Sequence, residues 1–317
     1  MKRLPNSASA PLTSLAISTH TSSLYAGCWD KQIYEISLGA SASETRRLSG
    51  HTDFVKCLLA TALDGRSILL SGGADAAVIV WDLNSGKQLH KLKGHVKALQ
   101  NFAIDPLSLP EGSQEPKDSF VLFSASSDRE IRRWHISRDS AYELPESLQK
   151  PILAHDTSVY KLSFDNEGDL WTASADKTAK HLVRSREWES DTSLQHPDFV
   201  RDVVIADQAG LVVTACRDEE VRVWDASSGD LVCTYTGHFE EVTGLALTCD
   251  ENQLISVSID GTVRQWGLRR QDMTKYLEDV KQEASGEVTK SAAEKGSGSM
   301  LTAEEEAELA ELMDDDD

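Results

Sequence analysis

Histidine, hydroxyl and carboxylate side chains recur together along the first 270 residues. In each group a histidine stands upstream of a serine or threonine, and an aspartate follows that residue by four positions. A histidine beside a hydroxyl and a carboxylate is the residue set of nucleophilic catalysis, and histidines grouped with carboxylates can bind metal ions. The sets are His51, Ser71 and Asp75; His95, Ser124 and Asp128; His155, Thr172 and Asp176; His196, Thr214 and Asp218; and His238, Ser256 and Asp260.

The same groups lie in a repeated frame that predicts a series of small β-sheets. Six residues after the aspartate comes Leu182 in one frame and a tryptophan in the others, namely Trp81, Trp134, Trp224 and Trp266. A further, degenerate frame has Asp30 as its aspartate, Ala26 in place of the hydroxyl residue and no histidine. The six aspartates are 45, 53, 48, 42 and 42 residues apart. Apolar and polar residues alternate around them, which is typical of half-buried antiparallel strands.

This frame resembles the repeat of the WD-repeat β-propeller family, over about residues 1–270. Five frames in one register make chance agreement very improbable. The resemblance implies an all-β propeller with six readable blades, where seven is the usual number in the family. It also implies that the histidine, hydroxyl residue, aspartate and tryptophan of one unit form a buried, hydrogen-bonded structural tetrad that pins the blade.

A structural role for these side chains is therefore expected over catalysis or metal binding. An active site has no reason to occur five times, and the chain contains no GxSxG, P-loop or GxGxxG motif. One histidine per blade also spaces the imidazoles around a ring, too far apart to share a metal ion. We expect no enzyme activity, no cofactor, no metal site and no small-molecule substrate.

The number of blades stays open at this point. Residues 2–4 precede the first unit much as residues 46–48 and 91–93 precede later ones. In this family the N-terminal segment often supplies the outermost strand of the last blade. The ring has six blades, or contains a degenerate seventh, or receives one from a partner.

Residues beside the histidines and the turn aspartates are expected on one face of the propeller, because the two can meet only if their loops lie at the same end. Aromatic residues ringed by charges are typical of a protein-binding hot spot. The alternative is that Phe54 and Phe199 begin inner strands and pack downward. Since acids outnumber bases there, a basic or mixed-charge partner is expected. The candidate partner-binding residues are Trp29, Asp53, Phe54, Arg129, Asp198, Phe199, Arg217, Phe239 and Glu240.

The composition changes after residue 270, where we place the end of the propeller. Residues 271–317 contain 15 acids and 4 lysines and so carry −11 of the formal charge of −20. We expect a flexible linker over residues 271–300 and an acidic tail over residues 301–317. In the tail, Thr302 and Glu305 have capping-box spacing, so a short helix can begin there. Its apolar face, a further candidate partner-binding surface, contains Leu309, Leu312 and Met313.

The overall composition narrows the partners and the compartment. The 317 residues include 52 acids and 32 bases without a basic tract, which argues against direct binding of nucleic acid or an anionic membrane. No apolar run approaches the roughly 18 residues of a transmembrane helix, and none resembling a signal peptide follows the first residues. The five cysteines form no CxxC motif and are expected to be reduced core thiols of a cytoplasmic or nuclear protein.

These features predict a non-catalytic scaffold or adaptor within a multiprotein complex. The propeller face would hold one partner, and the acidic tail would hold a basic client or act only as a solubilising segment. Ribosome assembly or chromatin is the favoured setting. One alternative is a substrate receptor of a cullin-RING ubiquitin ligase, whose members carry Trp-Asp-x-Arg; here Trp266-Gly267-Leu268-Arg269 has the arginine without the acid. Another is a non-catalytic subunit that supports an enzyme partner.

Overall fold

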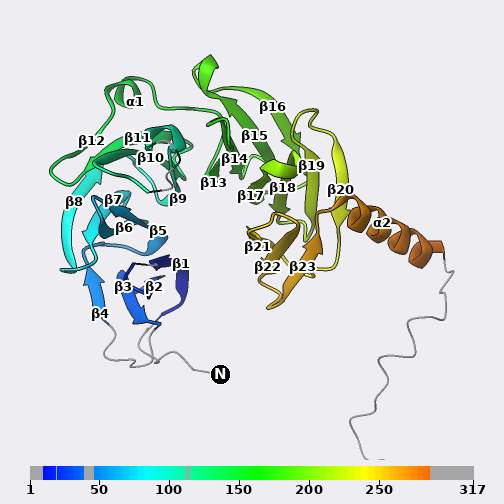
Figure 1. The fold of residues 1–317 in the computed structure, drawn as a ribbon, viewed down its shortest axis with the longest axis horizontal. Coiled ribbons are helices and arrows are strands. Elements are labelled where there is room, and N and C mark those ends of the chain that lie inside the picture. Colours follow the sequence, from blue (N-terminus) through cyan, green and yellow to red (C-terminus); the bar gives the residue numbers. More distant parts are fainter. Residues whose placement is uncertain (1–9, 19, 39–45, 111, 113–114, 286–317) are drawn as a thin grey trace, which may run out of the picture. The chain divides into compact units, whose positions relative to one another are not determined.

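The computed structural model describes residues 10–18, 20–38, 46–110, 112 and 115–285. The chain divides into two compact units, Met1–Arg269 and Arg270–Asp317. The first unit contains six antiparallel sheets, which follow one another around a common axis in chain order (Figure 1). We call these sheets blades 1 to 6. They confirm the predicted all-β propeller with one sheet for each of the six readable repeats.

Blades 1 to 3 are four-stranded, and strands consecutive in the chain are neighbours in each sheet. Blade 1 consists of β1 (Leu12–Ser18), β2 (Ser23–Cys28), β3 (Gln32–Ser37) and β4 (Arg46–Ser49). Blade 2 consists of β5 (Val55–Leu63), β6 (Arg66–Gly73), β7 (Ala77–Asp82) and β8 (Lys87–Lys93). Blade 3 consists of β9 (Leu99–Ile104), β10 (Ser119–Ser126), β11 (Ile131–Ser137) and β12 (Ala141–Glu143).

Blades 4 and 5 repeat this order, whereas blade 6 has three strands among the described residues. Blade 4 consists of β13 (Val159–Phe164), β14 (Leu170–Ser174), β15 (Thr178–Val183) and β16 (Glu189–Gln195). Blade 5 consists of β17 (Val200–Ala206), β18 (Leu211–Cys216), β19 (Val221–Asp225) and β20 (Leu231–Tyr235). Blade 6 consists of β21 (Val242–Leu247), β22 (Gln253–Ser258) and β23 (Val263–Gly267). Residues 2–4, considered above as an outermost strand, lie outside the described residues.

The same tight turn joins the second and third strands of every blade. In each turn the aspartate carboxylate accepts a hydrogen bond from the backbone N–H two residues later, at 2.7–3.4 Å. The residue between them has a left-handed backbone, with φ between 59° and 79°. Aspartate suits this turn because its short side chain caps the backbone locally. The six positive-φ residues are Lys31, Ala76, Arg129, Lys177, Glu219 and Gly261.

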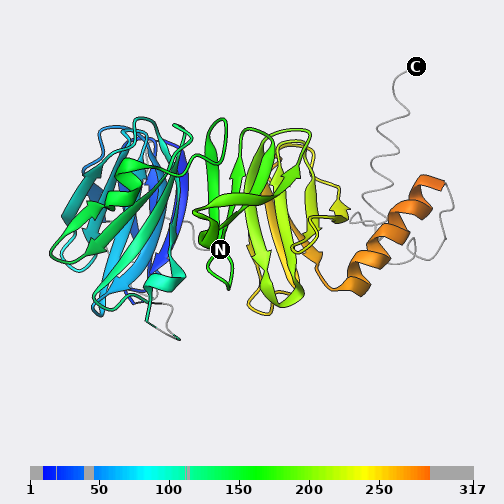
Figure 2. The same ribbon diagram turned by 90° about the horizontal axis from the view of Figure 1, so that it is seen from above.

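Apolar clusters between consecutive blades form the core. The inner strands β1, β5, β9, β13, β17 and β21 each contact the next one in this order. One cluster joins Ile33 of blade 1 to Val55 of blade 2, and another joins Val78 of blade 2 to Leu99 of blade 3. Figure 2 shows the strands running between two ends of this unit, where the loops gather. The blades thus bury their faces against one another and leave loops free at both ends.

Helices are few. The connections contain η1 (Pro106–Ser108), α1 (Pro145–Gln149), η2 (Arg184–Arg186) and η3 (Asp207–Ala209), and the second unit contains α2 (Arg270–Ser285). The expected flexible linker is therefore wrong for residues 271–285, a stretch of mostly strong helix formers without glycine or proline. No described helix is both long enough and apolar enough to cross a membrane.

Candidate protein-binding face

A buried chain of hydrogen bonds links four side chains of blade 2. The Trp81 indole Nε1–H donates to the Ser71 hydroxyl at 2.8 Å, and that hydroxyl lies 2.8 Å from Nε2 of His51. Nδ1 of the same imidazole lies 2.9 Å from the Asp75 carboxylate. A neutral imidazole with its proton on Nδ1 satisfies every link, because Nε2 then accepts from the hydroxyl.

The same connection recurs in other blades. Histidine Nε2 lies 2.7–2.8 Å from the serine or threonine hydroxyl in blades 2 to 6. Histidine Nδ1 lies 2.8–3.0 Å from the turn aspartate in blades 2, 3, 4 and 6. The indole bond to the hydroxyl is 2.7–2.9 Å in blades 2, 3, 5 and 6. Each such chain ties a histidine loop to the adjacent turn of the blade.

The electrostatics of blade 2 agree with a neutral histidine beside a charged aspartate. Burial lowers the pKa of His51 below its ordinary value, and the hydrogen bond and charge of Asp75 only partly oppose this. Burial alone would raise the pKa of the Asp75 carboxyl, but hydrogen bonds from the Thr52 N–H and His51 outweigh it, so that pKa is lowered. The pair therefore has fixed protonation states near neutral pH rather than a proton ready for transfer.

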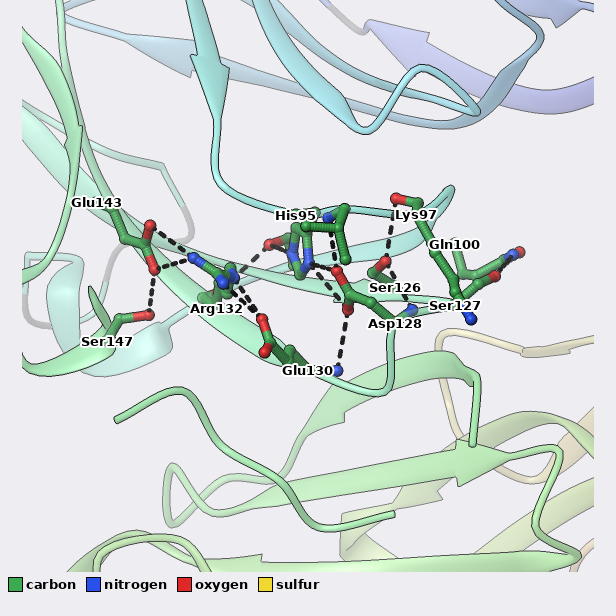
Figure 3. Close-up of polar contacts among 12 residues, drawn as sticks. His95, Lys97, Gln100, Ser126, Ser127, Asp128, Glu130, Arg132, Glu143 and Ser147 are labelled. Atoms are coloured by element: carbon green, nitrogen blue, oxygen red, sulfur yellow. Dashed lines mark hydrogen bonds and ion pairs between the residues drawn. The ribbon is translucent and has the colours of Figure 1, made fainter. Parts of the chain in front are cut away.

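In blade 3 the tetrad continues into a wider polar network (Figure 3). Asp128 also accepts hydrogen bonds from the backbone N–H groups of Val96 and Glu130. Arg132 contacts the carboxylate of Glu130 and donates to both oxygens of Glu143 at 3.0 Å. This network fixes the third and fourth strands of the blade to its turn.

Blades 4 and 5 depart from the full tetrad. Leu182 occupies the tryptophan position of blade 4 and is buried, so the chain ends at Thr172. In blade 5 the predicted His196–Asp218 pairing is wrong, since Nδ1 of His196 faces the Leu194 carbonyl at 3.1 Å. Asp218 instead pairs with Arg222 at 2.7 Å, and the same guanidinium contacts Glu220.

Blade 1 replaces the missing histidine with a tyrosine. Asp30 accepts a hydrogen bond from the Tyr34 hydroxyl at 2.5 Å and another from the Gln32 N–H at 3.0 Å. The Cys28 thiol, buried beside this turn, donates to the Ala10 carbonyl at 3.2 Å. The turn geometry is thus retained although the tetrad is absent.

None of these groups is arranged as a reaction centre among the described residues. His95, Asp128 and Glu130 are close enough to hold a metal ion, but their ligand atoms already bond to Ser124, to backbone N–H groups and to Arg132. Four cysteines are buried, and burial raises the pKa of both Cys216 and Cys233 to about 11, which leaves them as thiols. Cys249 is exposed, contrary to the expectation that all five are core residues.

The end of the propeller that carries the histidine loops and the turns, here called the turn face, displays aromatic side chains. Trp29 follows β2 of blade 1, and Phe54 precedes β5 of blade 2. Their rings stack at 5.1 Å with an angle of 12°, and both side chains are exposed. This stack spans the junction of two blades and leaves one aromatic surface open to solvent.

Cation–π pairs extend the aromatic surface to blades 5 and 6. The Arg217 guanidinium lies 5.2 Å from the ring centre of Phe199. Phe239 is 73% exposed, with the Arg264 guanidinium 5.9 Å from its ring. Stacked and arginine-capped aromatic rings are rigid and amphipathic, which suits a protein contact.

The comparisons with known proteins agree with this geometry. The family model for the WD domain, G-beta repeat, matches residues 188–225 and 229–267. A protein from Schizosaccharomyces pombe named "Uncharacterized WD repeat-containing protein C126.01c" is 37% identical over 299 residues, which cover 92% of this chain and 72% of that protein. The chain belongs to the WD-repeat family.

Other matches are more partial. The model for the tRNA methyltransferase TRM82 WD40 domain matches residues 47–197 of this WD-repeat protein. Pre-mRNA-processing factor 19 of Bos taurus is 30% identical over 182 residues, covering 56% of this chain and 32% of that protein. Periodic tryptophan protein 2 of Arabidopsis thaliana is 31% identical over 136 residues, covering 41% of this chain and 15% of that protein.

The other predicted contact residues of the WD-repeat unit divide into two groups. Asp53 and Asp198 are half-buried, and each carboxylate accepts the N–H of the next residue at 2.8 Å. Arg129 and Glu240 are exposed at the turn face. The tail residues Leu309, Leu312 and Met313 lie outside the described residues.

Val96 of the turn face is exposed, although it was not among the predicted contact residues. Val96, which follows His95, is 78% exposed. Its backbone N–H donates to Asp128 at 2.9 Å, and the N–H of Phe239 donates to Asp260 at 3.1 Å in the same way. This bond holds the backbone against the turn and directs the side chain outward. The position directly after each tetrad histidine is therefore the signal that identifies such residues.

Proposed function

We propose that this WD-repeat protein is a non-catalytic scaffold whose turn face binds another protein of a multiprotein complex. The observation that carries the proposal is the exposed Trp29–Phe54 stack, which lies between two blades and is not needed to bury either of them. Exposed aromatic rings of this kind are the usual anchors of protein interfaces. Exposed Arg129, Arg217 and Glu240 on the same face supply polar residues for the rim of such a contact.

RNA processing is the setting that we favour for this complex. One similar protein is named for pre-mRNA processing and one matching family model for a tRNA methyltransferase, and both matches support that setting. The acidic balance of the chain argues that it contacts protein components rather than the RNA itself. A nuclear location accords with this proposal. Ribosome assembly and chromatin, favoured from the acidic tail, also supply basic proteins as clients.

A double variant tests the face directly. Trp29→Ala with Phe54→Ala should reduce recovery of the proteins that co-purify with the chain at least tenfold, because it removes the anchor. The matched control is Leu231→Ala, an exposed residue that begins β20, at the opposite end of that strand from the His238 loop. The melting temperatures of all variants should stay within a few degrees of that of the original protein. Equal partner recovery from the double variant and the control would refute the proposal.

The acidic tail is proposed to hold a basic client, such as a ribosomal protein or a histone. Replacing Asp314, Asp315, Asp316 and Asp317 with asparagine in the full chain should release that client at a lower salt concentration. The control neutralises the same number of exposed acids on the propeller, namely Asp64, Asp139, Glu189 and Asp230. Identical salt profiles for the two variants would show that the tail has no dedicated role.

A second candidate function is a non-catalytic subunit of an RNA-methylating enzyme, supported by the match of residues 47–197 to the TRM82 WD40 domain model. The purified complex should then transfer methyl groups from S-adenosylmethionine to tRNA, whereas the chain alone should not. The ubiquitin-ligase alternative rests on Arg269, which is exposed and donates to Asn252 at 3.1 Å. Arg269→Ala should abolish co-purification of a ligase adaptor only under that alternative.

A further inference from the structure

One position of the third strand distinguishes blade 6 from all the others. The residue three positions after the turn aspartate is at most 1% exposed in blades 1 to 5, whereas Val263 in blade 6 is 68% exposed. The buried equivalents are Ile33, Val78, Ile131, Ala179 and Val221. Since valine gains stability from burial, the exposure of Val263 marks a place where a neighbour is missing.

The residue paired with this position on the second strand shows what the neighbour is. It is glycine or alanine in blades 1 to 5 and Val257 in blade 6. A Cβ on Gly27 would lie 2.9 Å from Val55, and a Cβ on Gly72 would lie 2.9 Å from Leu99. The inner strand of the following blade therefore packs directly against this position, and only a small side chain fits there. Val257 is itself exposed, so no inner strand covers it among the described residues.

Blade 1 lacks the matching contact on its other side. Every later inner strand begins with a fully buried aliphatic residue that packs against the preceding blade, namely Val55, Leu99, Val159, Val200 or Val242. β1 begins with Leu12, which is 47% exposed, and its Leu15 and Ile17 are each 62% exposed. The inner strand of blade 1 thus presents an uncovered apolar surface.

These two surfaces border the same opening, because no extensive packing joins blade 6 to blade 1 among the described residues. We call this opening the open junction and define it by Leu12, Leu15 and Ile17 on blade 1 and Val257 and Val263 on blade 6. The opening therefore has an exposed apolar surface on each of its two sides.

We propose that the open junction binds a sheet-forming segment of another protein, which takes the place of a seventh blade. The packing between consecutive blades, from blade 1 to blade 6, specifies the chemistry of this segment. Toward Val257 and Val263 it must present an inner strand that begins with an aliphatic residue. Toward Leu12 and Leu15 it must present a small residue beside a β-branched one. A segment with both surfaces is a β-sheet of at least three strands, because the first surface lies on the inner strand and the second on the next two.

The sequence outside the described residues does not supply such a segment. Residues 1–9 are enough for one strand of about 30 Å but not for three. Residues 286–317 contain 11 acids, and Val288 is their single β-branched aliphatic residue. A partner protein is therefore the occupant that fits. This proposal is independent of the Trp29–Phe54 stack, so either binding surface can fail its test without the other.

Site-specific photocrosslinking tests the occupant. The full chain would carry benzoylphenylalanine at Leu15 or at Val263 in its own cells, with Leu231 as the exposed control position. We expect both junction positions to crosslink to one protein, within a single stretch of alternating apolar residues, and the control position not to do so. Crosslinks to residues 1–9, to a second copy, between blades 1 and 6 of one chain, or to no defined product would overturn the proposal.

Charged variants test the energetic role of the junction. Val263→Asp and Leu15→Asp should each reduce recovery of the crosslinked protein at least tenfold, because they place a charge against an apolar surface. Leu231→Asp is the matched control and should retain full recovery, as should the Trp29→Ala, Phe54→Ala double variant. The melting temperature of each variant should match that of the original chain, since both substituted side chains are exposed. Full recovery with Val263→Asp would contradict the proposal.

Discussion

Blades 2 and 6 have the same hydrogen-bonded tetrad but different packing. The indole-to-hydroxyl bond is 2.8 Å in both, and the histidine–hydroxyl distances are 2.8 and 2.7 Å. Trp81 is nevertheless buried, whereas Trp266 is only half-buried, and Val78 is covered where Val263 is not. The tetrad is therefore a property of one blade, whereas burial depends on the blade that follows it.

The largest difference is expected between aspartate substitutions at the two equivalent valines. Val78→Asp places a carboxylate in a closed apolar contact and should cost more than about 4 kcal/mol, enough to prevent folding. Val263→Asp should change stability by less than about 0.5 kcal/mol, because the side chain is already in water. Chemical denaturation of both variants measures this. Similar losses in both would mean that blade 6 is covered in solution.

Removing the central hydroxyl tests whether the tetrads contribute equally. Ser124→Ala leaves the His95 and Trp134 nitrogens unsatisfied in a buried site and should cost about 3 kcal/mol. Ser256→Ala should cost about 1 kcal/mol less, because Trp266 is half-buried and water can replace part of the bond. The free energies of unfolding, measured side by side, decide this. Equal losses would show that exposure of the indole has no effect.

In blade 5, the protonation state of His196 differs between the folded and the unfolded chain at mildly acidic pH. Burial lowers the pKa of His196 to about 4, helped by the nearby Arg222 charge. Above pH ~6.5 the imidazole is neutral in both folded and unfolded chains, so its contribution to stability is complete there. Between pH ~6.5 and 4 only the unfolded chain gains the proton, and stability falls by roughly 2–3 kcal/mol. His196→Gln should flatten this part of the stability–pH curve, and an unaltered slope would contradict the assignment.

The smallest effects are expected on the second strand, at the residue that pairs with Val221 in blade 5 and with Val263 in blade 6. Ala215→Val inserts two methyl groups beneath the next inner strand and should cost about 1–2 kcal/mol. Val257→Ala should cost less than about 0.5 kcal/mol, since that side chain is already exposed. Thermal unfolding of the two variants provides the measurement. A loss of more than about 1 kcal/mol for Val257→Ala would indicate that something covers the open junction in the isolated chain.

Several features of the candidate site were predictable because they depend on nearby residues. The turn aspartates, their left-handed neighbours and most histidine–hydroxyl–tryptophan bonds lie within one repeat and follow its register. The His196–Asp218 pair was mispredicted because Arg222 takes the Asp218 carboxylate. Arg132 has the same position in blade 3, but it pairs with Glu130 and Glu143 and leaves Asp128 to His95. Helix α2 was missed because acidic composition suggests disorder even where strong helix formers are continuous.

By itself, the sequence determined the number of readable repeats, the positions of the turn aspartates and most of the tetrad bonds, since each is specified by local spacing within one repeat. Only the tertiary structure decided which equivalent apolar residues are buried. Val78 and Val263 occupy the same register and face the same side of their sheets, yet one is 1% and the other 68% exposed. Burial is a relation between two surfaces, and the surface that covers a blade belongs to a distant part of the chain or, as proposed at the open junction, to another molecule.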